Sequence, residues 1–195
     1  MATADSPHVV AICGSLRDKS HTRVALNRAL EAAEDAGGTA ELIDLRTFEL
    51  PIFDADDDDA ADATELTQRV RDGDAILLGT PMYHGSYSSP LKTALDYCGF
   101  DEFEHKTVGL LGVAGGSFPI TALDHLRSVC RALDAWVLPY QAAVPNASSR
   151  IEDGAFVDES IEERVATLGR RTVQFANIGT DPSSFESDQN VGAGN

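Results

Sequence analysis

The sequence predicts an α/β fold: a doubly wound, five-stranded parallel sheet of strand order 2-1-3-4-5, with helices on both faces. Short apolar runs, typical of strands buried on both faces, alternate along the chain with segments of helical periodicity. The loops richest in glycine, serine and aromatic residues follow the carboxyl ends of three of these runs. This alternation favours parallel strands joined by helical crossovers.

The first strand is predicted at residues 9–13, where the sequence VVAIC is uniformly apolar. A polar turn follows, and residues 24–36 then have the periodicity of a helix with a small, alanine-rich face. The pair Gly37-Gly38 is a stop signal for this helix. A second strand is expected at residues 40–45.

The second half of the chain continues the alternation, and Thr64 is a suitable cap for the helix that opens it. Helices are expected over 64–71 and 91–97. Two later helices are expected from their core faces, one with Leu123, Leu126, Cys130 and Leu133 and one with Ile161, Val165 and Leu168 that ends near Ala176. Strands are expected over 74–80, 107–113 and 135–138, the last continuing toward 144.

Length and composition predict one domain over residues 8–178, with a flexible N-terminus, 1–7, and a disordered tail, 179–195. No run approaches the roughly 20 apolar residues of a membrane span, and the N-terminus lacks the apolar core of a signal peptide. The three cysteines show neither CxxC nor zinc-finger spacing, which is typical of small apolar side chains in a reducing compartment. We therefore expect a cytoplasmic protein.

The charge is strongly negative, with 32 acidic and 15 basic residues and a net charge of -17. This charge argues against binding to nucleic acid or to anionic membranes, because both attract basic surfaces. The acidic residues are mostly Asp, and Arg outnumbers Lys. This bias indicates adaptation to molar salt, as in an extreme halophile, where screening over about 3 Å mutes self-repulsion.

A strand, a polar turn and a helix start meet at residues 9–22, VVAICGSLRDKSHT. The first turn of a helix leaves backbone N–H groups unpaired and carries the positive end of the helix dipole, so it suits an anion such as phosphate. Ser15, Ser20 and Thr22 add hydroxyl groups, and Arg17 adds a permanent charge with several N–H donors.

Two further loops end at the same edge of the predicted sheet. They are residues 81–90, which carry two tyrosines, and residues 114–119, which carry two glycines. In a sheet of order 2-1-3-4-5, ligands bind at the carboxyl ends of the strands, at the switch point between the first and third strands. We therefore expect all three loops to converge on one ligand.

Three motifs resemble the NADPH-dependent FMN reductase family of flavodoxin-like proteins. GSLRDKSHT at 14–22 resembles its phosphate loop, PMYHGSYSSPLKTALDY at 81–97 its flavin-ring segment, and GLLGVAGGS at 109–117 its third, glycine-containing loop. The likeness covers residues 9–145. The first two motifs are specific in combination, because each matches several residue types and they occur in the family's order.

This resemblance implies a flavodoxin-like fold that binds FMN. The implied cofactor-binding residues at the phosphate are Ser15, Arg17, Ser20 and Thr22, and His21 in the same loop also belongs to the cofactor site. Along the ring and ribityl chain they are Pro81, Met82, Tyr83, His84 and Ser86, and at the pyrimidine edge Gly115, Gly116 and Ser117. Thr22 and His84 stand where the family often has Asn, and Met82 stands where an acidic residue is common. Thr22 keeps a hydroxyl for the phosphate, and backbone groups can replace the other two side chains.

The implied activity is that of an FMN-dependent oxidoreductase. It would take a hydride from NADPH or NADH and reduce a flavin, a quinone or a similar small acceptor by a ping-pong mechanism. Because the flavin carries the chemistry, no catalytic side chain and no metal are expected. The alternatives are a single-electron carrier like the flavodoxins and a flavin-binding module that senses redox state. Arg17 weighs against the carrier, because flavodoxin phosphate loops typically lack such a cation.

Other interpretations of these residues are weaker. The aspartate-rich stretch 48–63 lacks the glycine and terminal Glu of a calcium loop, so it is interpreted as a solvated surface loop. Ser15 and His84 are not part of a GxSxG nucleophile elbow. The glycines of residues 109–116 do not form a GxGxxG motif with an acidic partner.

Self-association is also expected. The family resemblance implies a homodimer or homotetramer. Four aromatic residues near the flavin segment are the candidates for an apolar interface: Tyr87, Tyr97, Phe100 and Phe103.

Overall fold

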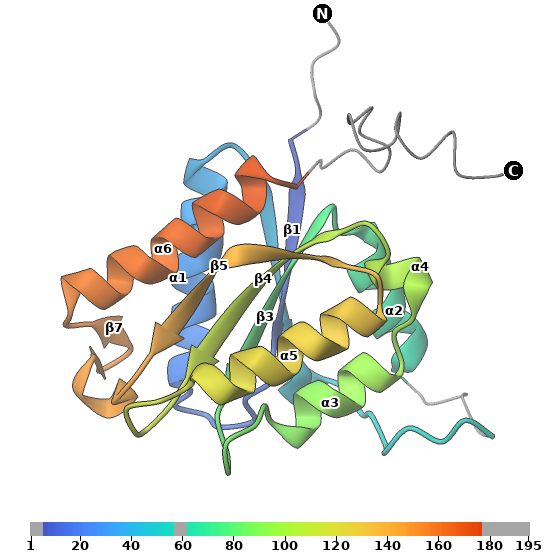
Figure 1. The fold of residues 1–195 in the computed structure, drawn as a ribbon, viewed down its shortest axis with the longest axis horizontal. Coiled ribbons are helices and arrows are strands. Elements are labelled where there is room, and N and C mark those ends of the chain that lie inside the picture. The colour runs from blue at the N-terminus through green and yellow to red at the C-terminus, as the bar shows by residue number, and fades with distance from the viewer. Residues whose placement is uncertain (1–5, 57–61, 177–195) are drawn as a thin grey trace, which may run out of the picture.

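The computed structural model describes residues 6–56 and 62–176. A five-stranded, all-parallel sheet of order β2-β1-β3-β4-β5 lies between two layers of helices, as Figure 1 shows. The strands are β1 (His8–Cys13), β2 (Thr39–Asp44), β3 (Ala75–Pro81), β4 (Thr107–Val113) and β5 (Trp136–Val144). This topology confirms the predicted doubly wound, flavodoxin-like fold.

Burial along the strands follows their place in the sheet. Every residue of β3 and β4 is buried, and so is β1 from Val9 onward, because helices cover both faces of these central strands. The edge strands β2 and β5 are only partly buried. Pro139 lies within β5, where an edge position tolerates the missing backbone donor.

The two helical layers bury separate cores. Helices α1 (His21–Asp35) and α6 (Glu159–Gln174) pack against each other on one face. Helices α2 (Ala63–Asp72), α3 (Ser89–Asp96), α4 (Phe100–Phe103) and α5 (Ile120–Ala132) cover the other face. The backbones of α1 and α6 come so close that a Cβ added to Gly169 would lie 1.9 Å from the carbonyl oxygen of Ala29.

The register brings the carboxyl ends of the strands together. Cys13 pairs with Gly79, and Gly112 pairs with Thr80 on one side and with Ala143 on the other. The loops that follow β1, β3, β4 and β5 therefore leave from one edge of the sheet, at the bottom of Figure 1.

Several element boundaries differ from the predictions. Helix α1 begins at His21, three residues before the predicted start, because Ser20 caps it. Asp62, rather than Thr64, holds the N-cap position of α2. Helix α4, the hairpin of β6 (Ile151–Glu152) and β7 (Ala155–Phe156), and the 3-10 turns η1 (Leu45–Thr47) and η2 (Ala147–Ser149) were not predicted, because such short elements carry no periodic pattern.

One part of the predicted aromatic interface is wrong. The side chain of Phe103 is 0% exposed and belongs to the core beneath α4. Tyr97 is engaged within the chain, since its hydroxyl donates to the carbonyl of Pro51 at 3.0 Å and its ring meets Phe53 edge-on. Of the four, Phe100 is the most exposed, at 59%.

The predictions for the two chain ends and for part of the acidic loop fall on residues that the structure does not describe. Most of the predicted flexible N-terminus (1–7), the whole predicted tail (179–195) and residues 57–61 of the acidic stretch lie outside the described residues. The domain limits of 8–178 stay a prediction. Among the helices described, none has the length and apolar character needed to cross a membrane.

Candidate functional site

The loop between β1 and α1 brings three hydroxyl side chains to the first turn of α1. Ser15, Ser20 and Thr22 are each no more than 4% exposed. The Ser20 hydroxyl accepts the backbone N–H of Arg23 at 3.1 Å and so caps the helix. The remaining N–H groups of the first turn, with the positive end of the helix dipole, make this helix end suitable for an anion.

Basic side chains surround this helix end. Arg17, Lys19 and His21 all line the hollow in front of it. Within residues 6–56 and 62–176, the exposed Arg17 side chain makes no hydrogen bond or ion pair, whereas the neighbouring Asp18 pairs with Arg46 at 3.3 Å. Arg17 is therefore available to a ligand, in a chain whose net charge is strongly negative.

Arg23 holds the shape of this loop, a role that was not predicted from the sequence. Its Nη2 donates to the backbone carbonyls of Arg17, at 3.2 Å, and of Asp18. Its Nη1 lies 3.5 Å from the Asp44 carboxylate at the end of β2. No local motif marks this role, because it depends on how β2 aligns with β1.

The loop after β3 contains a tight turn. The backbone N–H groups of Tyr83 and Ser86 each donate to the other residue's carbonyl at 3.0 Å. The two residues between them, His84 and Gly85, have φ angles of 50° and 80°, the left-handed conformation that such two-residue turns require. This turn presents Tyr83, whose side chain remains about half exposed, at 52%.

The side chain of Ser86 lies toward α5. Its Oγ is 2.9 Å from Nδ1 of His125. At the other end of the segment, the backbone N–H of Met82 donates to the carbonyl of Val113 at 2.8 Å. The segment is thus anchored to α5 and to the end of β4.

The loops after β4 and β5 are joined by backbone hydrogen bonds. The N–H of Asn146 donates to the Gly116 carbonyl, and that of Ala147 to the Ala114 carbonyl, both at 2.9 Å. A Cβ added to Gly115 would meet no atom within 4 Å, because this backbone borders open space. The chain thus leaves room beside Gly115 for a ligand to approach.

These loops enclose a hollow of about 280 Å³. The predicted residues that line it are Ser15, Arg17, Ser20, His21, Thr22, Pro81, Met82, Tyr83 and Gly115. The predicted residues His84, Ser86, Gly116 and Ser117 lie in the same loops but not on its wall. Residues not predicted that also line it are Lys19, Val113, Ala114, Ala147 and Ser148. Ala147 and Ser148 follow β5, whose carboxyl end belongs to the same edge, so their place directly after a strand is the sequence signal that marks them.

The cysteine side chains take no part in this site. Burial raises the pKa of the Cys13 thiol, and it raises the pKa values of Cys98 and Cys130 to about 12. These thiols are therefore protonated and unreactive near neutral pH. Ser15 lines the hollow without a hydrogen bond to any histidine in the part of the chain that the structure describes, which disfavours a hydrolase triad.

A doubly wound sheet with an anion-binding helix end and further loops at its switch point defines a nucleotide-binding protein of the flavodoxin type. The chain belongs to the NADPH-dependent FMN reductase family, whose sequence profile matches residues 7–149. It is accordingly an oxidoreductase that uses a flavin and a nicotinamide donor.

Individual proteins and solved structures that are similar to this chain are also flavin-dependent oxidoreductases by their descriptions. A Staphylococcus aureus protein described as FMN-dependent NADPH-azoreductase is 33% identical over 175 residues, covering 85% of this chain and 93% of that protein. Among solved structures, an NADH:FMN oxidoreductase (EMOB) has a TM-score of 0.73 at 20% identity, covering 91% of this chain and 93% of its own. The flavoenzyme NAD(P)H:(acceptor) oxidoreductase (FerB) of Paracoccus denitrificans has a TM-score of 0.74 at 21% identity, covering 87% and 97%. These two similarities show the shared fold.

Proposed function

We propose that this protein binds FMN in the hollow at the end of α1, takes a hydride from NADPH or NADH, and passes the electrons to a flavin, a quinone or a similar small acceptor. The observation that carries this proposal is the convergence of the anion-binding loop with the Tyr83 turn and the Gly115 backbone on one hollow. The azoreductase relative supports NADPH as a donor and adds azo compounds to the candidate acceptors.

The residues present fit FMN. Thr22 is 2% exposed and Ser15 is 3% exposed, yet neither hydroxyl makes a hydrogen bond within the described parts of the chain, although both line the hollow. Because both side chains line the hollow, their hydroxyls are available to a polar ligand group such as a phosphate. The open space beside Gly115 suits the flat edge of a ring.

Each part of the hollow has a distinct role in this proposal. Ser15, Arg17, Ser20 and Thr22 hold the phosphate together with the first-turn N–H groups of α1, and His21 lies beside them. The ring and the ribityl chain lie along residues 81–86. Gly115 and its neighbours Gly116 and Ser117 border the pyrimidine edge.

The bound flavin supplies the chemistry, accepting a hydride from the nicotinamide and then giving up its electrons to the acceptor. The protein positions the ring and leaves one side open beside the half-exposed Tyr83. Donor and acceptor then use the same open side in turn, which gives ping-pong kinetics. The backbone N–H groups of Gly115 and Gly116, which have no partner among residues 6–56 and 62–176, are available to stabilise negative charge at the ring edge.

The assembly and cellular setting form part of the same proposal. Phe118, Ile120 and Phe100 expose 78%, 48% and 59% of their surface, which supports association into a homodimer or homotetramer. Three free, buried cysteines agree with a reducing cytoplasm. The acidic composition supports a halophilic origin, and it disfavours nucleic acid or membrane partners.

An absorbance spectrum of the protein purified in molar salt, followed by anaerobic titration with NADPH and with NADH, tests this function. We expect a flavin spectrum, either as purified or after addition of FMN, that bleaches on addition of the nicotinamide and returns with a quinone or free flavin. Protein that neither binds FMN nor oxidises NAD(P)H would overturn the proposal. A stable one-electron-reduced flavin with negligible NAD(P)H oxidation would instead identify an electron carrier.

A further inference from the structure

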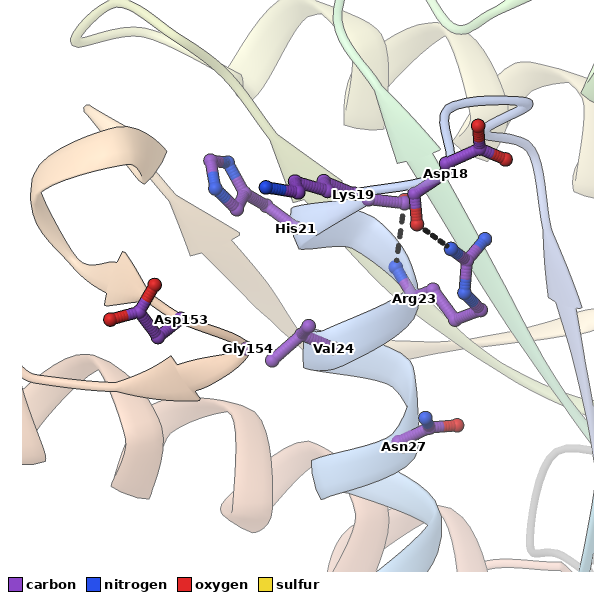
Figure 2. Close-up of a pocket in the computed structure, with 9 residues that line it drawn as sticks. Asp18, Lys19, His21, Arg23, Val24, Asn27, Asp153 and Gly154 are labelled. Atoms are coloured by element: carbon purple, nitrogen blue, oxygen red, sulfur yellow. Dashed lines mark hydrogen bonds between the residues drawn. The ribbon is translucent and has the colours of Figure 1, made fainter.

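A second cavity adjoins the hollow at its phosphate end. It has a volume of about 500 Å³ and lies between the first two turns of α1 and the turn of the β6–β7 hairpin, as Figure 2 shows. Lys19, Ser20 and His21 line both this cavity and the hollow. The two spaces therefore meet where the proposed function places the flavin phosphate. A cavity of this size falls within the roughly 300–1,000 Å³ of small-molecule sites.

The cavity wall combines several kinds of binding group. Lys19 and His21 lie at the end shared with the hollow, where they can donate hydrogen bonds to a phosphate. Farther along α1, Val24 offers an apolar surface, and the amide of Asn27 can both donate and accept. Across the cavity, the exposed Asp153 carboxylate can accept hydrogen bonds from hydroxyl groups.

The far side of the cavity is held in a defined position. Asp153 and Gly154, at the turn between β6 and β7, have φ angles of 47° and 84°, as in a tight two-residue turn. The hairpin is tied at its base by the backbone N–H of Val157, which donates to the Arg150 carbonyl at 2.9 Å, and by the ion pair of Arg150 with Asp158. The cavity thus has two structured walls.

Arg23 does not contribute its charge to this cavity. Although it borders the space, its guanidinium is directed to the carbonyls of the loop after β1 and to Asp44. The positive charge available to a ligand therefore lies at the shared end, with Lys19, and the His21 ring beside it can donate a hydrogen bond. From that end toward Asn27, the wall offers donors for a phosphate, the apolar side chain of Val24 and a polar amide. The Asp153 carboxylate lies opposite and can accept hydrogen bonds from ribose hydroxyls.

We propose that this cavity holds the adenosine monophosphate half of FAD, so that the protein binds FAD as well as FMN. This inference rests on the proposed function, because it places the flavin phosphate at the end of α1. FAD is FMN extended through its phosphate by an adenosine monophosphate, and the cavity begins where that extension begins. The second phosphate lies near Lys19 and His21, the adenine over Val24 toward Asn27, and the ribose toward Asp153.

Equilibrium binding of FMN and of FAD to flavin-free protein in molar salt tests this proposal, with flavin fluorescence as the readout. Asn27→Trp fills the cavity from an exposed position of α1 that does not line the flavin hollow. Glu34→Trp is the matched control, since it places the same side chain on an exposed position two turns farther along α1, outside the cavity.

We expect the unmodified protein to bind FAD with a dissociation constant no more than about tenfold above that of FMN. Asn27→Trp should weaken FAD binding by at least about tenfold while leaving FMN binding within about twofold. Glu34→Trp should change neither constant. Adenosine monophosphate at millimolar concentration should compete with FAD but not with FMN.

Other results would show whether the FAD proposal alone is wrong or the proposed function is wrong as well. If FMN binds but FAD binds more than about 100-fold more weakly, the assignment of the cavity to FAD is wrong and the proposed function stands. The same conclusion follows if Asn27→Trp changes the binding of both flavins alike or of neither. If neither flavin binds, both are wrong. If Asn27→Trp raises the KM for NADPH while FAD binding is unchanged, the cavity holds the adenylate of the nicotinamide donor, which also overturns the assignment to FAD.

Discussion

The hydroxyl of Ser88 donates a 2.6 Å hydrogen bond to the backbone carbonyl of Gly14, and so joins the loop after β3 to the loop after β1. The loop after β1 is also tied to strand β3, where the N–H of Gly14 donates to the Gly79 carbonyl at 2.8 Å. The Ser88 N–H in turn donates to the hydroxyl of Thr80 at 2.9 Å. These bonds are buried, and they set the spacing between the phosphate end and the ring end of the hollow.

Replacement of Ser88 by alanine should weaken both the fold and the cofactor site. The Gly14 carbonyl loses a buried partner, which costs about 1–3 kcal/mol in the free energy of unfolding. The loops are then free to separate, so FMN affinity should fall as well. Chemical denaturation and FMN titration measure the two effects, and Ser89→Ala, at an exposed neighbour, serves as the control. Unchanged values for Ser88→Ala would contradict this role.

Replacement of Arg17 by alanine should weaken FMN binding without affecting the fold. Hydrogen bonds to a charged group contribute about 1.5–3 kcal/mol, so the dissociation constant for FMN should rise by about 10- to 100-fold. Riboflavin lacks the phosphate, and its affinity should not change. The exposed Arg131→Ala, on α5, is the control for loss of positive charge. Equal losses for FMN and riboflavin would show that Arg17 does not contact the phosphate.

Replacement of Gly169 by alanine should destabilise the packing of α1 on α6. The new Cβ would lie 1.9 Å from the Ala29 carbonyl oxygen, so the two helices must move apart, at a cost of at least about 1–3 kcal/mol. Gly115→Ala provides the contrast, because its Cβ meets no protein atom. That variant should keep its thermal stability and bind FMN more weakly. A Gly169→Ala protein of unchanged stability would show that α1 and α6 pack less closely than the 1.9 Å approach implies.

The carboxylate of Asp158 should make stability depend on pH at the acidic end. The Ser160 hydroxyl and then the Ile161 N–H, together with the charge of Arg150, hold the pKa of Asp158 below its usual value. A carboxyl whose pKa is lowered in the folded state stabilises the protein fully above its unfolded pKa of about 3.9, and this contribution is lost as the pH falls through the lowered value.

Asp158→Asn keeps a capping side chain for α6 but removes the charge. The difference in unfolding free energy between the unmodified protein and this variant should therefore be steady near neutral pH and should shrink below about pH 4. Urea unfolding in molar salt across this range measures it. Asp124→Asn is the control, because the exposed Asp124 carboxylate makes no hydrogen bond or ion pair among the described residues. A difference independent of pH would assign the effect to capping alone.

The protein should lose stability as salt is removed. Its net charge of -17 creates self-repulsion, which is screened over about 3 Å in molar salt and over a much longer distance in dilute buffer. The midpoint of thermal unfolding should therefore fall as sodium or potassium chloride is lowered from molar to millimolar concentration. Equal midpoints at both concentrations would refute a dependence on salt.

Much of the fold follows from local patterns. The apolar runs of β3 and β4 and the periodicity of α1, α5 and α6 were enough to predict these elements to within a few residues. The hairpin of β6 and β7 was missed because it is too short to carry a pattern. Phe103 was expected on the surface and lies in the core, since nothing local shows which face of a four-residue helix is covered.

The site residues that are close together in the sequence could be predicted from it. Ser15, Arg17 and Thr22 could be identified because a strand, a polar turn and a helix start are contiguous in the sequence. Arg23 was missed because its contact with Asp44 depends on how β2 aligns with β1, and Ser88 was missed because its hydroxyl binds the carbonyl of Gly14, which is far away in the sequence.

The sequence by itself determined the type of fold, the anion-binding character of the loop after β1 and the acidic surface, because periodicity, hydroxyl and charge content, and composition are properties of neighbouring residues or of the whole chain. Only the tertiary structure decided that Ser88 reaches Gly14, that Gly169 meets Ala29, and that a second cavity opens beside Lys19. These contacts join residues far apart in the chain. They exist only once the register of the sheet and the packing of the helices have fixed which backbone groups come within hydrogen-bonding or van der Waals distance.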